Sequence, residues 1–142
     1  MTPVLLGRWQ SRLFLTWTAG LVVALIFGAL YDRLPETVVM LVYVTLVGML
    51  LDILYDRLQR LRWENDWPPA FHVATGILEG LVLWLLMLHP IFSDQLPGLT
   101  RAVTSGQFLS MYVTMFILIF LVNWNLMKVF FPHWRYRGGR IL

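Results

Sequence analysis

Residues 13–31 read LFLTWTAGLVVALIFGALY, a run of 19 residues that contains no charged side chain. A helix needs roughly 20 residues to cross the hydrocarbon core of a bilayer, which is about 30 Å thick. Residues 102–127 form a second uncharged run, and residues 37–54 and 70–88 are apolar segments that each contain a single acidic residue. The sequence therefore predicts four membrane-spanning helices.

The composition of the whole chain supports this prediction. Of its 142 residues, 58% are hydrophobic and 13% are charged, and the mean hydropathy is +0.69. Soluble domains are about 45–50% apolar and about 25% charged, and a domain of this length is too small to bury so much apolar surface. We predict an all-α integral membrane protein, a single domain of residues 1–142 that folds as an antiparallel bundle of four transmembrane helices with short loops. The predicted spans are residues 13–31, 37–56, 69–89 and 106–130.

The distribution of basic residues predicts the orientation. Nine of the 11 Lys and Arg residues precede the first span, lie between the second and third spans, or follow the fourth. Positive charges accumulate on the cytoplasmic side of membrane proteins. We therefore expect a multi-pass protein with cytoplasmic N- and C-termini, a cytoplasmic hairpin at 56–68, an outer loop at 90–105 and a cytoplasmic tail at 132–142. The basic residues form no helix face of the kind that binds phosphate, so we expect no nucleic-acid partner.

Small residues predict where the helices approach one another, because small side chains let helix backbones pack tightly in lipid. Gly20, Ala24 and Gly28 recur every four residues on the first span, and Gly76 and Gly80 form a G-x-x-x-G motif on the third. Packing within one chain and packing between copies are both consistent with these two helix-packing faces. Packing within one chain is the simpler interpretation.

Two acidic residues fall inside predicted spans and need an explanation. A charged side chain near the bilayer centre costs at least about 2.5–3.5 kcal/mol. Glu79 lies near the middle of the third span and Asp52 near the cytoplasmic end of the second. His72 shares the helix face of Glu79 through its i, i+7 spacing. We predict an intramembrane polar cluster in the cytoplasmic half of the bundle, made of Asp52, His72, Glu79, Asn123 and Asn125.

Three interpretations of this cluster are open. In the structural one, a protonated Glu79 donates a hydrogen bond between helices, because burial favours the neutral carboxyl group. In the second, Glu79 binds a proton or cation coupled to transport, and Asp52 and His72 form the cytoplasmic entrance. In the third, the cluster holds haem or a hard cation. We expect no cofactor and no metal site, because haem lacks a second histidine at matching depth and no known cation-binding spacing is present.

A surface rich in arginine and tryptophan is predicted on the cytoplasmic side. Asp56 and Arg60 are spaced i, i+4, so we expect the second helix to continue beyond the membrane. In one interpretation, this surface contacts anionic lipid headgroups, which attract each basic residue by about 1 kcal/mol. In the other, it docks a partner protein, because Trp and Arg are the residue types that dominate binding hot spots. The residues of this partner or headgroup surface are Arg57, Arg60, Arg62, Trp63, Trp67, Trp134, Arg135 and Arg137.

No hydrolase, thiol or metal-enzyme motif occurs in the sequence, which has no cysteine and no G-x-S-x-G. We therefore expect a small non-enzymatic membrane subunit that assembles with itself or with a larger membrane complex, in contact with the lipid bilayer. Its contacts would be the small-residue helix faces and the cytoplasmic Arg/Trp-rich surface. The alternative is a homo-oligomeric proton- or cation-coupled transporter or channel that uses Glu79 with Asp52 and His72.

Overall fold

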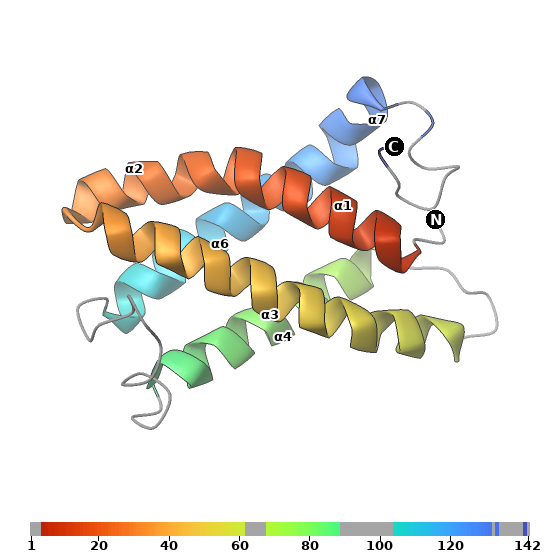
Figure 1. The fold of residues 1–142 in the computed structure, drawn as a ribbon, viewed down its shortest axis with the longest axis horizontal. Helices are drawn as coiled ribbons and strands as arrows, with labels where there is room; N and C mark the ends of the chain where they lie inside the picture. The colour runs from red at the N-terminus through yellow and green to blue at the C-terminus, as the bar shows by residue number, and fades with distance from the viewer. Residues whose placement is uncertain (1–3, 62–67, 89–103, 132, 134–140, 142) are drawn as a thin grey trace.

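The part of the chain that the structure describes is helical except for the turn at Asp32 and Arg33 and a few residues that flank the helices. The computed structural model describes residues 4–61, 68–88, 104–131, 133 and 141, and these contain no β-strand. Four helical segments among them are long and apolar enough to cross a membrane: Leu5–Tyr31, Leu34–Arg60, Pro69–Met87 and Ser105–Leu126 (Figure 1). The predicted all-α class and the prediction of four apolar helices of spanning length are confirmed.

The first segment begins eight residues before the predicted span, and this difference places two arginines on the helix. It consists of α1 (Leu5–Leu15), the π-helical turn η1 (Thr16–Gly20) and α2 (Leu21–Tyr31). The helix continues through Arg8 and Arg12 because the charge at each position is accommodated by contacts with the second and third segments. Single π turns inside α-helices often mark functional sites. Here the π turn begins one helical turn after Arg12.

A tight turn joins the first and second segments. Asp32 adopts the left-handed conformation with φ 53°, which an L-residue rarely takes and which Asp tolerates better than most. The N–H of Arg33 donates to the carbonyl oxygen of Gly28 at 2.8 Å and closes the end of α2. α3 (Leu34–Arg60) starts at once with Pro35 in its first turn, where the missing N–H of proline is harmless.

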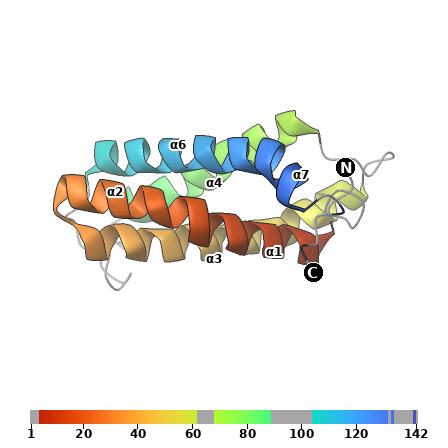
Figure 2. The same ribbon diagram turned by 90° about the horizontal axis from the view of Figure 1, so that it is seen from above.

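The other two segments lie on the opposite side of the bundle. α4 (Pro69–Leu88) is one uninterrupted helix, whereas the fourth segment contains α6 (Ser105–Leu121), the π-helical turn η2 (Val122–Leu126) and α7 (Met127–Phe130). α6 begins in a capping box, in which Thr104 and Gln107 each accept a hydrogen bond from the other's backbone N–H, at 3.3 and 3.0 Å. Seen from above, α4 and α6 lie on one side and α1, α2 and α3 on the other (Figure 2).

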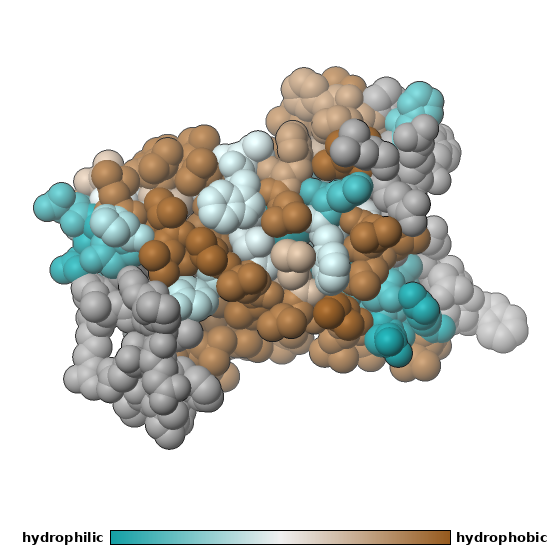
Figure 3. Space-filling model, viewed as in Figure 1, coloured by the Kyte–Doolittle hydropathy of each residue, from teal (hydrophilic) through white to brown (hydrophobic). Residues whose placement is uncertain are grey.

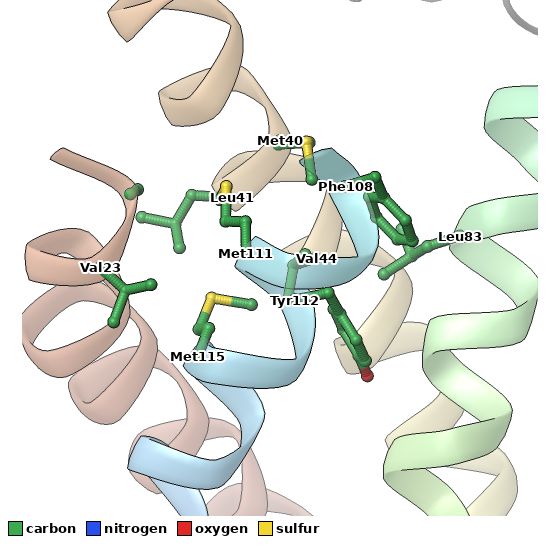
Figure 4. Close-up of a cluster of buried hydrophobic side chains, with 10 residues drawn as sticks. Val23, Met40, Leu41, Val44, Leu83, Phe108, Met111, Tyr112 and Met115 are labelled. Carbon is green, nitrogen blue, oxygen red and sulfur yellow. The ribbon is translucent and has the colours of Figure 1, made fainter. Parts of the chain in front are cut away.

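An apolar core fills the half of the bundle near the Asp32 turn (Figure 4). Its side chains come from α2, α3, α4 and α6 and pack around the fully buried Phe108 and Leu41. The buried residues of this core are Val23, Ala24, Met40, Leu41, Val44, Leu83, Phe108, Met111, Tyr112 and Met115. On the face shown in Figure 3, the middle of the bundle is also largely hydrophobic, and hydrophilic groups gather toward the two ends.

The predicted small-residue positions lie where helices of the same chain meet. A side chain at Gly76 would overlap the ring of Phe116, and a Cβ at Gly80 would lie 2.6 Å from the Tyr112 ring, so both glycines let α6 approach α4. Gly28 likewise has no room for a side chain beside Leu34 and Thr37, and Gly20 faces Leu41 and Met115; Ala24 is fully buried. Both faces are therefore occupied within one chain.

Candidate functional site: an arginine between two buried carboxylates

One guanidinium group joins three of the four helical segments. Arg12 on α1 donates from Nε and Nη2 to the two carboxylate oxygens of Asp52 on α3, at 2.8 and 3.2 Å. Its Nη1 donates to both oxygens of Glu79 on α4, at 3.0 Å each. Five donors in a rigid planar fork allow arginine to hold two carboxylates in this way, and lysine lacks that geometry. We call Arg12, Asp52 and Glu79 the Arg12 triad.

The backbone of α3 provides the space in which the guanidinium lies. Gly48 is one turn before Asp52, and a Cβ added there would overlap the Nη1 and Cζ atoms of Arg12. The guanidinium therefore rests directly on the glycine. Because the side chain of Arg12 passes over Gly48, it reaches both Asp52, which is on α3 with Gly48, and Glu79 on α4.

The two carboxylates are buried, the guanidinium is partly exposed, and the charges of the three groups do not cancel. Asp52 is 4% exposed and Glu79 is 6% exposed, whereas the side chain of Arg12 is 19% exposed. Two carboxylates and one guanidinium have a formal charge of −1 when all three are ionised. A second buried arginine on α1, Arg8, donates to the side-chain oxygen of Gln59 at 2.6 Å and lies within electrostatic reach of Asp52. The positive charge of Arg8 therefore acts on the Asp52 side of the triad.

Two tyrosine hydroxyl groups hold the turn of α4 that precedes Glu79. Tyr112 on α6 donates to the carbonyl oxygen of Gly76 at 2.7 Å, and Tyr55 on α3 donates to that of Thr75 at 3.4 Å. A backbone carbonyl oxygen has two lone pairs, so each of these carbonyls can accept a tyrosine hydrogen bond in addition to its helical one. The Tyr112 bond connects α6 to the turn of α4 that precedes Glu79. All four helical segments therefore meet around Glu79.

The structure brings together two of the five residues of the predicted polar cluster. Asp52 and Glu79 meet through Arg12. His72 instead lies edge-on against Trp124 of η2, with ring centroids 6.3 Å apart. Asn125 is exposed and donates to the carbonyl oxygen of Leu121 on its own helix at 2.9 Å, and Asn123 is half-buried.

Arg12 is the residue of the site that the sequence pattern does not single out, because its position is that of a basic flank that sets topology. A signal was present in the sequence. Two acids inside apolar segments require a cation, and Arg12 directly precedes the uncharged run of the first span. Gly48, four residues before Asp52, is a second signal, because it leaves one face of that helix open for a long side chain.

The predicted Arg/Trp-rich surface is only partly within the described residues. Arg57 and Arg60 are exposed near the end of α3, where Arg60 forms the predicted i, i+4 ion pair with Asp56 at 2.8 Å. Ile141 donates its backbone N–H to the side-chain oxygen of Gln10 at 3.0 Å, so this part of the tail lies beside α1. The remaining members lie outside the described residues: Arg62, Trp63, Trp67, Trp134, Arg135 and Arg137.

The chemistry available at the site is that of an ion cluster. Within the residues that the structure describes, no three His, Asp or Glu side chains converge in a way that could hold a metal ion. The oxygens of Asp52 and Glu79 already accept hydrogen bonds from Arg12. No protein-family model matches the sequence, and no match is found among curated proteins or solved structures. Function is therefore inferred from the geometry of this site and from the surface around it.

Proposed function

We propose that the chain is a multi-pass integral membrane protein whose four helical segments cross the bilayer as an antiparallel bundle, with both termini in the cytoplasm. The apolar length of each segment and the hydrophobic middle of the surface support insertion (Figure 3). The excess of Lys and Arg near the termini and between the second and third segments supports the orientation. Reporters fused to either terminus are expected to give cytoplasmic signals, and an outer signal from either one would overturn the orientation.

Within that membrane, we propose that the protein is a non-enzymatic subunit that assembles with itself or with a larger membrane complex. The observation that carries this proposal is the uneven burial of the four segments. In their most apolar stretches, the first two segments are 33% and 39% buried, whereas Ser105–Leu126 is 22% buried and Pro69–Met87 is 17% buried. α4 is thus the segment that its own chain covers least.

The exposed face of α4 is continuous and apolar. Ile77, Leu81 and Leu85 are all exposed and recur every four residues, so they form one stripe along the helix. The two glycines of α4 contact α6 within the chain. The assembly surface that we propose is therefore this stripe, together with Arg57 and the cytoplasmic surface near it, rather than the small-residue faces.

The chain lacks cysteine, which makes disulfide cross-linking a direct test. Leu81→Cys in native membranes is expected to form cross-linked dimers or adducts with a partner subunit. Leu46→Cys on the exposed face of α3 is the matched control, because its exposure is similar and it lies on a different helix. Equal cross-linking at both positions, or a bare monomer after purification in mild detergent, would contradict the proposal.

The second candidate function is proton- or cation-coupled transport, and the sharing of one guanidinium by Asp52 and Glu79 favours it. Buried ionisable residues inside apolar segments commonly mark ion pathways and proton relays. In proteoliposomes, Glu79→Gln is expected to abolish proton-coupled flux while helical content is retained. Unchanged flux in the folded variant would eliminate this candidate.

A further inference from the structure

We propose that Glu79 is a binding site for one exchangeable proton, and that Arg12 keeps its contact with Asp52 when the proton is bound. The site is a property of the Arg12 triad and does not depend on whether the protein assembles or transports. It assigns different roles to the two carboxylates: Asp52 remains the counter-ion of the guanidinium, and Glu79 takes up and releases the proton.

The first argument is the balance of charge at Glu79. Both carboxylates lie within about 3 Å of the same cation, so the positive charge that attracts Glu79 is already neutralised by Asp52. A like charge close to a carboxylate favours its neutral form, and so does burial. Because Glu79 is 6% exposed, water screens these effects only weakly.

The second argument is the unequal geometry of the two contacts. Asp52 faces the Nε–Nη2 edge of the guanidinium and accepts from two different nitrogens, which is the bidentate arrangement that gives the strongest arginine–carboxylate pairs. Glu79 accepts from the single nitrogen Nη1. Protonation of Glu79 therefore loses less interaction energy with Arg12 than protonation of Asp52 would.

The proton forms an O–H bond at one Oε atom of Glu79. That oxygen then no longer accepts from Nη1, while the other Oε atom can keep its hydrogen bond to Arg12. Arg12 and Asp52 form a neutral pair in this state. Proton uptake therefore removes the net charge of the triad and loosens the connection between α1 and α4 without breaking that between α1 and α3.

Among the residues that the structure describes, Arg12 is the cation that contacts Glu79. Arg12 and Asp52 are the charged groups that act on it, one attracting and the other repelling. The positive charge of Arg8 acts on Asp52 and Asp56, which lie on α3. The nearby phenols of Tyr55 and Tyr112 donate their protons to backbone carbonyls of α4, and the ring of His72 lies against Trp124.

Infrared spectroscopy of the full chain in lipid bilayers tests the proposal, because a protonated carboxyl group has a C=O band distinct from that of a carboxylate. Glu36 and Glu64 are the other two glutamates of the sequence, and replacing both by Gln leaves Glu79 as the sole glutamate. In that background, a carboxylic-acid band that titrates while the helical circular dichroism is unchanged is expected. The band must shift when isotopically labelled glutamate is incorporated.

Two variants complete the test. Glu79→Gln is expected to lose the titrating band, and Asp52→Asn to shift the titration to lower pH, because removing the repelling charge leaves Glu79 alone with Arg12. If Glu79→Gln does not fold, the isotope label and Asp52→Asn decide the outcome. A band that is absent throughout the folded range, that persists in Glu79→Gln, or that does not move in Asp52→Asn would overturn the assignment. The oligomeric state of the same samples is a separate readout, so failure of this site leaves the assembly proposal untouched.

Discussion

Replacement of Arg12 by methionine removes the guanidinium while keeping an unbranched apolar side chain of similar reach. It leaves Asp52 and Glu79 buried in one site with no cation between them, and all four hydrogen bonds of the triad are lost. Removing one partner of a buried ion pair costs about 3–5 kcal/mol, mainly because a charge stays buried without compensation. We expect Arg12→Met to lower the free energy of unfolding by about this amount, which is a large part of the 5–15 kcal/mol typical of a folded domain.

The assay is equilibrium unfolding in mixed detergent micelles, followed by circular dichroism. Arg33→Met is the matched control, because Arg33 pairs with Glu36 at 3.8 Å with its own side chain 37% exposed. Exposed pairs of this kind contribute about 0–1 kcal/mol. Arg12→Lys is expected to lie between wild type and Arg12→Met, because it restores the charge without the planar fork.

The triple variant Arg12→Met, Asp52→Asn, Glu79→Gln tests the cause of the loss. Since it contains no buried charge, it is expected to recover most of the stability that Arg12→Met loses. If Arg12→Met and Arg33→Met were equally stable, or if the triple variant were the least stable of the set, the reasoning from buried charge would be refuted.

Three further changes test the surroundings of the triad. Gly48→Ala is expected to cost about 1–3 kcal/mol because the new Cβ overlaps the guanidinium of Arg12, whereas Gly106→Ala, at a position with open space around it, should be neutral or slightly stabilising in the same unfolding assay. Tyr112→Phe removes the 2.7 Å hydrogen bond to the carbonyl of α4 and is expected to cost about 0.5–1.5 kcal/mol, and an unchanged midpoint would show that this bond contributes nothing. Thr104→Ala removes half of the capping box of α6, with an expected loss of about 1 kcal/mol and faster amide exchange in the first turn of that helix; equal exchange rates would contradict it.

The helical segments could be predicted from sequence because hydropathy alone determines them. A long uncharged segment is stable in a bilayer as a helix, because every backbone N–H and C=O group then forms a hydrogen bond within the segment. The beginning of the first helix was harder, because Arg12 follows the pattern of a basic flank. A charge at the end of an apolar run is compatible with both a flank and a buried pair, and only the position of α3 and α4 distinguishes the two.

The composition of the site illustrates the same limit. Asp52 and Glu79 were singled out because their burial is costly in any arrangement. The contacts of His72 and Asn125 depend on the angle and position at which α4 and the fourth segment cross. The spacing of residues along one helix shows which of them share a face, but it does not specify how two helices cross. The π turns η1 and η2 change which side chains face the neighbouring helices, and no residue type in the sequence predicts a π turn.

The central claim is that the guanidinium of Arg12 contacts the carboxyl group of Glu79 between α1 and α4. Solid-state NMR of the full chain in lipid bilayers, with isotopically labelled arginine side chains and glutamate carboxyl groups, measures that contact directly. A strong dipolar coupling is predicted, consistent with the 3.0 Å hydrogen bonds from Nη1 to the Glu79 oxygens, and it should vanish in both Arg12→Lys and Glu79→Gln. A wild-type spectrum without this coupling, or persistence of the coupling in either variant, would contradict the account.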